Sequence, residues 1–290
     1  MGDLLETVRS LGVNFDLIER VTIIDGILLN KSPLRVGRPS EGLGEPLDLI
    51  VEKLPDGTPY IPGSSLKGTL RSLAERLARS EELPVCEVFT HRNSCHVAAW
   101  LLRKAHEHFL TGMYKYSDLI KSVKIQFEEV PLYPKLAELR SFEEAVDLLK
   151  SKELPCPVCR LFGNTELASH IIVYDALPEN GEPAIGYRTR VAIDRLRRAA
   201  RSGALFRYEY VEPGCKWRFR LKLYNLGLNG NDSASRLFKS LIEYIKEFGL
   251  EVGSMKSVGL GLLELAEARA VVYEVKEFKL VRVEEKRLTR

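Results

Sequence analysis

The sequence is poor in glutamine and has no strong excess of charge of either sign. Gln126 is the only glutamine in 290 residues, while charged residues make up 29% of the chain, a bias that is typical of thermophilic proteins. The formal net charge of +3 excludes a histone-like polycation, so binding of a polyanion must come from local basic patches. No apolar run is long enough to span a bilayer and no segment resembles a signal peptide, so we expect a soluble cytoplasmic protein.

Several common enzymatic motifs are also missing. The chain has no Rossmann fingerprint, no H-E-x-x-H zinc motif and no recognisable Ser-His-Asp set. A Walker nucleotide-binding loop needs a lysine directly after its last glycine, whereas Lys67 precedes Gly68. The sequence therefore gives no support for ATP or GTP binding or for these catalytic arrangements.

The most informative segment is 60–71, which reads Y-I-P-G-S-S-L-K-G-T-L-R. Its Pro-Gly pair ends a strand, and Ser64 or Ser65 is expected to cap a following helix by accepting a backbone N–H bond. Leucines then recur at helical spacing and predict one buried stripe, formed by Leu66, Leu70, Leu73 and Leu77.

The same helix is expected to carry two cations on another face near its start. Lys67 and Arg71 are four residues apart, so they are neighbours on the helix surface. Together with the unpaired N–H groups and the positive dipole end, they predict an anion site for which phosphate is the natural ligand. The alternative is an ordinary capped core helix.

Apolar periodicity predicts an α+β fold with an inserted helical block. Outside 82–165 the expected order is strand, helix, strand, strand, helix, strand, which is the split βαβ or ferredoxin-like unit. We therefore expect one domain over 1–290, with a core at about 18–81 and 166–290 and a largely helical insertion at about 82–165. RNA-recognition motifs use this topology, but so do many enzymes, so the fold alone does not decide the function.

Four of the five cysteines lie within the expected insertion. The C-x-x-C pair of Cys156 and Cys159 is typical of one half of a zinc site, and disulfides are not expected in a cytoplasmic protein. The remaining ligands must come from Cys86, His91, Cys95 or His96, with Cys86 and Cys95 as our first choice. Four protein ligands leave no open position, which favours a structural zinc ion over a catalytic one. The alternative is a set of buried thiols on an ordinary turn.

A glycine-rich loop, G-S-M-K-S-V-G-L-G at 253–261, lies between an expected helix and an expected strand. Glycine lets the backbone approach a ligand closely and turn its N–H groups toward phosphate. Lys256, Gly259 and Gly261 are therefore candidate nucleic-acid contacts, with a flexible β-turn as the alternative.

Arginines and aromatic residues are interleaved between 187 and 210. The segment contains Arg188, Arg190, Arg195, Arg197, Arg198, Arg201 and Arg207 together with Tyr187, Phe206, Tyr208 and Tyr210. Asp194 is the single balancing acid between 188 and 207. This mixture suits a single-stranded nucleic acid, through phosphate neutralisation and base stacking, and Arg188, Arg190 and Arg195 are the chosen contacts. A solvated charged helix is the alternative.

Four segments resemble, in the same order, the motifs of the RAMP superfamily of CRISPR-associated proteins. They are I-P-G-S-S-L-K-G-x-x-R at 61–71, C-P-V-C-R-L-F-G at 156–163, I-D-R at 193–195 with G-A-L-F at 203–206 and Glu209, and the loop 253–261. Within that superfamily the chain is most similar to the Csm-like backbone subunits of type III effector complexes.

The resemblance implies a modified RRM-like core and subunits that stack in a helical filament along the CRISPR RNA, beside other subunits of the complex and away from membranes. It implies a thumb that separates segments of the guide–target duplex. It places Arg35 where relatives often carry a histidine that contacts RNA, and it makes Ser64, Ser65, Lys67 and Arg71 the grip on the guide backbone.

The resemblance also implies cleavage of bound target RNA at regular intervals by a loop aspartate with Mg²⁺ or a similar divalent cation. Asp48 occupies the matching position, shortly before the I-P-G-S-S segment. From the residues alone an acid in an irregular stretch could position a metal ion or orient a nucleophile, but most loop aspartates do neither.

Two other functions stay open within the superfamily. One is a non-catalytic RNA-binding scaffold subunit, in which Asp48 is idle. The other, less favoured, is a CRISPR RNA-processing endoribonuclease, because such enzymes rely on a histidine near the first helix and none lies between residues 1 and 90. The arginine–aromatic run disfavours an unrelated ferredoxin-like metabolic enzyme.

Overall fold

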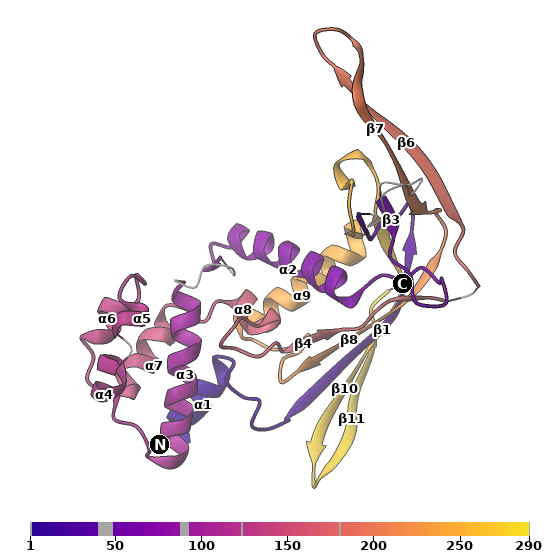
Figure 1. The fold of residues 1–290 in the computed structure, drawn as a ribbon. Helices are drawn as coiled ribbons and strands as arrows, with labels where there is room; N and C mark the ends of the chain where they lie inside the picture. The colour runs from indigo at the N-terminus through magenta and orange to yellow at the C-terminus, as the bar shows by residue number, and fades with distance from the viewer. Residues whose placement is uncertain (1, 40–48, 88–92, 123, 180, 290) are drawn as a thin grey trace.

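The computed structural model describes residues 2–39, 49–87, 93–122, 124–179 and 181–289 (Figure 1). The helices are α1 (Gly2–Ser10), α2 (Gly63–Ser80), α3 (Ser94–Thr111), α4 (Tyr116–Ser122), α5 (Lys124–Phe127), α6 (Tyr133–Ala137), α7 (Phe142–Ser151), α8 (Pro157–Phe162) and α9 (Ser233–Phe248). The strands are β1 (Arg20–Asn30), β2 (Gly37–Pro39), β3 (Leu49–Val51), β4 (Ile171–Val173), β5 (Leu177–Pro178), β6 (Ile185–Asp194), β7 (Ala199–Val211), β8 (Lys216–Tyr224), β9 (Leu250–Glu251), β10 (Leu262–Lys276) and β11 (Lys279–Arg287). None of the described helices combines the length and the hydropathy needed to cross a lipid bilayer.

The larger sheet is antiparallel and runs in the order β11-β10-β1-β8-β4, with β5 paired to β8 and β9 to β10. If β1, β4, β8 and β10 are taken as four core strands in chain order, they lie in the order fourth, first, third, second. With α2 after the first and α9 after the third, this is the connectivity of a ferredoxin-like unit. The expected α+β fold is confirmed at this level.

Helices α2 and α9 pack side by side over one face of this sheet (Figure 1). Three members of the predicted leucine stripe, Leu66, Leu70 and Leu73, are buried, and Leu77 is half-buried. Strand β8 alternates: Trp217 and Leu221 point inward while Arg218 and Arg220 are exposed. The other sheet face is therefore charged along β8.

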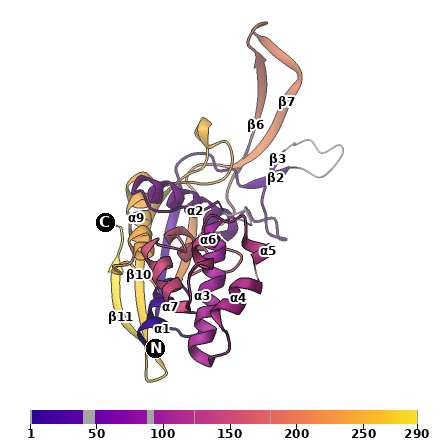
Figure 2. The same cartoon turned by 90° about the vertical axis from the view of Figure 1, so that its left-hand side faces the viewer.

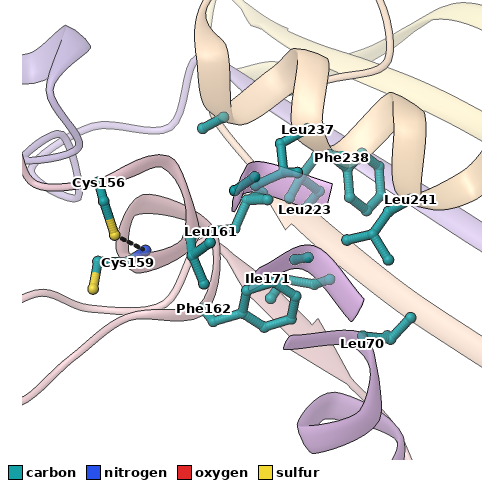
Figure 3. Packing of buried hydrophobic residues seen from close by; sticks show 14 of the residues in the cluster. Leu70, Cys156, Cys159, Leu161, Phe162, Ile171, Leu223, Leu237, Phe238 and Leu241 are labelled. Carbon is teal, nitrogen blue, oxygen red and sulfur yellow. Dashed lines mark hydrogen bonds between the residues drawn. The ribbon is translucent and has the colours of Figure 1, made fainter. Parts of the chain in front are cut away.

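Helices α3 to α7 form a block beside the sheet, together with α1 (Figures 1 and 2). The short helix α8 joins this block to the core, and Figure 3 shows Leu161 and Phe162 of α8 beside Leu70 of α2, Leu237 of α9 and Ile171 of β4. One apolar cluster runs without a break from the sheet to α3 and α7. The boundaries proposed for the insertion, 82 and 165, stay a prediction.

Strands β6 and β7 form a long hairpin that projects from the body of the molecule (Figures 1 and 2). The arginine-rich run therefore lies on a hairpin, and the charged helix considered as its alternative is wrong. At its base β7 pairs with β3, and β3 pairs with β2. Strand β2 thus gives regular structure to residues 37–39 of the segment between β1 and β3. A Cβ at Gly37 would lie 1.8 Å from the carbonyl oxygen of Ile50, so this close pairing needs glycine.

Candidate metal centre and nucleic-acid interface

Four cysteine side chains meet between the end of α2, the start of α3 and α8. The sulfurs of Cys86, Cys95, Cys156 and Cys159 all lie within 4.8 Å of one another, and those of Cys86 and Cys159 are 3.1 Å apart. A tetrahedral zinc ion with Zn–S bonds of about 2.3 Å needs sulfurs about 3.8 Å apart. The donor set, its number and its spacing fit a structural metal ion such as zinc.

Backbone N–H groups help to arrange these sulfurs. The N–H of Cys156 donates to the sulfur of Cys95 at 3.1 Å, and the N–H of Cys159 donates to the sulfur of Cys156 at 3.5 Å, the bond drawn in Figure 3. Hydrogen bonds from the neighbouring thiols, first that of Cys159, lower the pKa of Cys156, and the hydrogen bonds with Cys156 raise the pKa of Cys95 and Cys159, so the cluster holds its negative charge on Cys156. A thiolate is the form that binds metal.

The structure separates His96 from this cluster. Its Nδ1 lies 2.7 Å from the Thr165 hydroxyl, and its Nε2 lies 3.8 Å from a carboxylate oxygen of Glu166. His91, the other alternative, lies outside the described residues. Of the candidates that the structure describes, Cys86 and Cys95 are the pair that joins Cys156 and Cys159.

The expected serine cap of α2 is wrong. The helix begins at Gly63, its N-cap is Pro62, and neither Ser64 nor Ser65 precedes the first turn. The N–H of Gly63 instead donates to a carboxylate oxygen of Asp175 at 2.7 Å. A Cβ at Gly63 would lie 2.4 Å from the Val173 carbonyl oxygen, so the helix start packs tightly on β4 and takes its cap from the chain that follows β4. Ser64 is exposed and Ser65 half-buried.

The two cations predicted on α2 both contact the segment that follows the C-x-x-C pair. The Lys67 ammonium donates to the Ser169 hydroxyl at 2.8 Å, and burial, followed by the charge of Arg71, lowers its pKa. The Arg71 guanidinium donates to the Gly163 carbonyl at 3.0 Å, to Glu75 at 3.2 Å and to the sulfur of Cys159 at 3.9 Å. Their predicted contact with RNA stays untested, and the bonds observed here are internal.

A second group of candidate residues meets at the base of the hairpin. Tyr208, Tyr210 and Leu260 form a small apolar cluster, which we call the hairpin-base cluster, and Leu49, Phe206 and Met255 pack against it. It joins β7, the glycine-rich loop and the first residue of β3.

Arginines of β6 stack on the tyrosines of this cluster. The Arg188 guanidinium lies 4.7 Å from the centre of the Tyr210 ring, and that of Arg190 lies 5.8 Å from the centre of the Tyr208 ring. Stacking holds a planar guanidinium in place while its edge can still bind phosphate. Arg195 is exposed near the hairpin tip, directly after the end of β6, and so lies away from this cluster.

The glycine-rich loop is held against the segment after β1. The N–H of Ser254 donates to the Arg35 carbonyl at 3.0 Å, and the Arg35 guanidinium donates to the Ser254 hydroxyl at 2.6 Å. A Cβ at Gly253 would lie 2.2 Å from the Arg35 carbonyl oxygen. Arg35 itself is 4% exposed, and burial lowers its pKa. The loop is thus fixed by bonds to its neighbours, which argues against a simple flexible turn.

The outer part of the loop faces solvent. Lys256 is exposed, and Gly259 has a φ of +87° with open space where a Cβ would point. Gly261 also has a φ of +87°, but a Cβ there would lie 2.0 Å from the Val252 carbonyl oxygen, so this glycine serves close packing.

The family model of the RAMP superfamily matches residues 28–264, a stretch that includes the cysteine cluster, the hairpin and the glycine-rich loop. The chain belongs to the RAMP superfamily. No curated protein matches it at a significant level. RAMP proteins are CRISPR-associated and generally bind CRISPR RNA and other subunits of CRISPR effector complexes.

The predicted catalytic residue of this RAMP protein, Asp48, lies outside the described residues. Leu49, the next residue in the chain, pairs with Tyr208 of β7 at the hairpin base. Within the described residues, the cysteines are the one group of three or more His, Cys, Asp or Glu side chains close enough to share a metal ion, so no carboxylate cluster of that size is found there for Mg²⁺.

Two acids of this RAMP protein have positions that the sequence did not indicate. Asp175 caps α2 from 112 residues away. Glu209, quoted above only as part of a motif, is 5% exposed and accepts the N–H of Val51 at 3.0 Å and the Lys53 ammonium at 3.2 Å. Glu209 therefore links β3 to β7 of the hairpin. Neither contact follows from local sequence spacing.

Proposed function

We propose that this RAMP protein is a guide-RNA-binding backbone subunit of a type III CRISPR effector complex, similar to the Csm-like subunits, and that it stacks with copies of itself along the guide. The observation that carries the proposal is the projecting β6–β7 hairpin, with arginines stacked on tyrosines at its base, beside the glycine-rich loop. Cationic and aromatic groups on one element are what single-stranded RNA requires.

The hairpin serves as the thumb of this subunit. Strand β6 is exposed along most of its length and β7 over most of its outer part, so a duplex of guide and target can meet the outer hairpin from either face. Arg188 and Arg190 contact phosphates at the base, and Arg195 contacts them near the tip. Lys256 and the open backbone at Gly259 contact the same RNA from the loop.

Cleavage of the target is assigned to Asp48 with Mg²⁺ or a similar cation. The attacking group is the 2′-hydroxyl of the target RNA, so the site must supply in-line geometry and charge stabilisation more than a protein nucleophile. A single acid can then suffice. The scaffold subunit is the second candidate, because the described residues gather no further carboxylates for a divalent cation.

The metal of the cysteine cluster is assigned as zinc. Four thiolates around one ion match the preferred donors and geometry of structural zinc. Zinc supplies no chemistry there; it fixes the relative positions of α8, the end of α2 and the start of α3.

The decisive experiment compares wild-type protein with Asp48→Ala in the reconstituted complex, with target cleavage sites mapped. We expect the variant to bind RNA and assemble normally but to leave the target intact, and a target with 2′-deoxy residues at the cleavage sites to resist the wild type. Asp56→Ala, an exposed acid in the turn after β3, is the matched control and should cut normally. Cleavage by Asp48→Ala at the wild-type rate would exclude Asp48 as the catalytic residue and favour the scaffold function. Salt-insensitive or absent RNA binding would refute both functions.

A further inference from the structure

The side chain of Arg71 is held by hydrogen bonds inside the protein. Its side chain is 18% exposed, and within the described part of the chain it bonds to Glu75, to the Gly163 carbonyl and to the Cys159 sulfur. Three different N–H groups of one guanidinium make these three bonds, so the planar fork is fully oriented.

The negative charge of the zinc-bound cysteine cluster explains why the Arg71 guanidinium points toward it. Four thiolates around one Zn²⁺ leave an excess of two negative charges in a place where three of the four cysteines are buried. A buried charge needs compensating partners, and the Arg71 guanidinium donates a hydrogen bond to one of these sulfurs, that of Cys159. Hydrogen bonds from outside the ligand set orient metal ligands and raise metal affinity.

The neighbouring cation on the same helix face is engaged differently. Lys67, one turn earlier, bonds to the Ser169 hydroxyl and to no cysteine. Ser169 and Gly163 both belong to the stretch after the C-x-x-C pair, so this whole face of α2 packs on the metal-binding segment. Of Lys67 and Arg71, only Arg71 contacts a cysteine sulfur.

We propose that Arg71 is a positioning residue of the zinc centre: it donates to the Cys159 thiolate, balances the charge of the cluster and ties α2 to the bound metal. This inference rests on the zinc assignment above. Its consequence is that zinc occupancy fixes α2, and with α2 the start of the I-P-G-S-S segment. Arg71 then acts on RNA binding only through the metal.

The test measures zinc affinity of the full chain by competition with a chelator, and the charge-transfer absorption of the Co²⁺-substituted protein. Arg71→Met removes the charge and the donors while keeping an apolar stem, and we expect zinc affinity to fall by about 10- to 100-fold. Arg71→Lys keeps the charge without the fork and should lose less. Arg76→Met, an exposed arginine on the same helix, is the matched control and should bind zinc like the wild type.

The Co²⁺ spectrum separates this role from a general loss of stability. Loss of a hydrogen bond to Cys159 should shift the sulfur-to-metal band in Arg71→Met, and Arg71→Lys supplies the same readout if the methionine variant does not fold. Zinc-saturated Arg71→Met should bind RNA with wild-type affinity. Unchanged zinc affinity and an unchanged Co²⁺ band in both variants would overturn the proposal, and weakened RNA binding with normal zinc affinity would assign Arg71 to RNA instead.

Zinc binding by the wild-type chain and the role of Arg71 can be refuted separately. A wild-type chain that binds no zinc overturns the metal assignment and this inference with it. A wild-type chain that binds zinc, with Arg71 variants that bind it equally well, overturns the role of Arg71 alone.

Discussion

The cap of α2 by Asp175 allows a prediction in which the stability effect follows from one hydrogen bond. The bond from the Gly63 N–H to the Asp175 carboxylate is 2.7 Å long, and the first turn of α2 contains no acid of its own. A hydrogen bond to a charged group contributes about 1.5–3 kcal/mol, but Asp175 is exposed, so the range for helix caps, about 0.5–2 kcal/mol, applies.

We therefore expect Asp175→Ala to lower the free energy of unfolding by about 1 kcal/mol and the melting temperature by about 2–4 °C. Asp175→Asn keeps an acceptor for the Gly63 N–H and loses only the interaction of the charge with the helix dipole, so its loss should be about half as large. Both are measured by denaturant unfolding with parallel thermal melts.

Asp147→Ala, at an exposed position on α7, is the control and should be at least as stable as the wild type, since alanine favours helices. If Asp175→Ala unfolds at the wild-type denaturant concentration, Asp175 is not the cap of α2. If Asp175→Asn is destabilised as much as Asp175→Ala, the charge and not the acceptor dominates, and the argument from the hydrogen bond is refuted.

Three further predictions concern the hairpin, the metal and a buried histidine. Arg188→Met should weaken binding of single-stranded RNA and reduce the slope of log affinity against log salt by about 1, whereas Arg236→Met on α9 should leave both unchanged in the same titration. Removal of zinc with a chelator, or Cys159→Ser, should lower the melting temperature, and a chelator that leaves it unaltered would exclude a structural metal. Burial, opposed by a hydrogen bond to the Arg160 carbonyl, lowers the pKa of His170 to about 4 from 6.5. The unfolded chain then binds more protons between these values, so stability should fall as pH drops from about 6.5 to 4, by up to about 3 kcal/mol, with a flatter profile in His170→Gln.

Local sequence signals were enough to predict the helices and strands that bury one face. The leucine stripe of α2 depends only on spacing, and three of its four members are buried as expected. The C-x-x-C pair was also a local signal. The distal pair was not decided, because Cys86, His91, Cys95 and His96 are too close in sequence for spacing to rank them.

Contacts between distant segments could not be derived from the sequence. The cap of α2 comes from Asp175, and a partner of Arg71 comes from Gly163, which is 92 residues away. Serine next to a helix start is a good local cap, but tight packing of Gly63 on β4 displaced it. The arginine run gave no clear period, because a hairpin exposed on both faces has no buried side to impose alternation.

The geometry of the β6–β7 hairpin has a consequence for its local stability. Beyond the base, where β7 meets β3 and the hairpin-base cluster, the two strands pair with each other and with no other described strand. Their register shifts between Val191 and Ile193. A two-stranded ribbon without a covered face is marginally stable in water. Opening of the outer half should therefore cost far less free energy than opening of the sheet, and amide protons should exchange in a gradient from tip to base. RNA seated along the ribbon would provide the missing covered face, so that ordering of the tip becomes part of the free energy of binding.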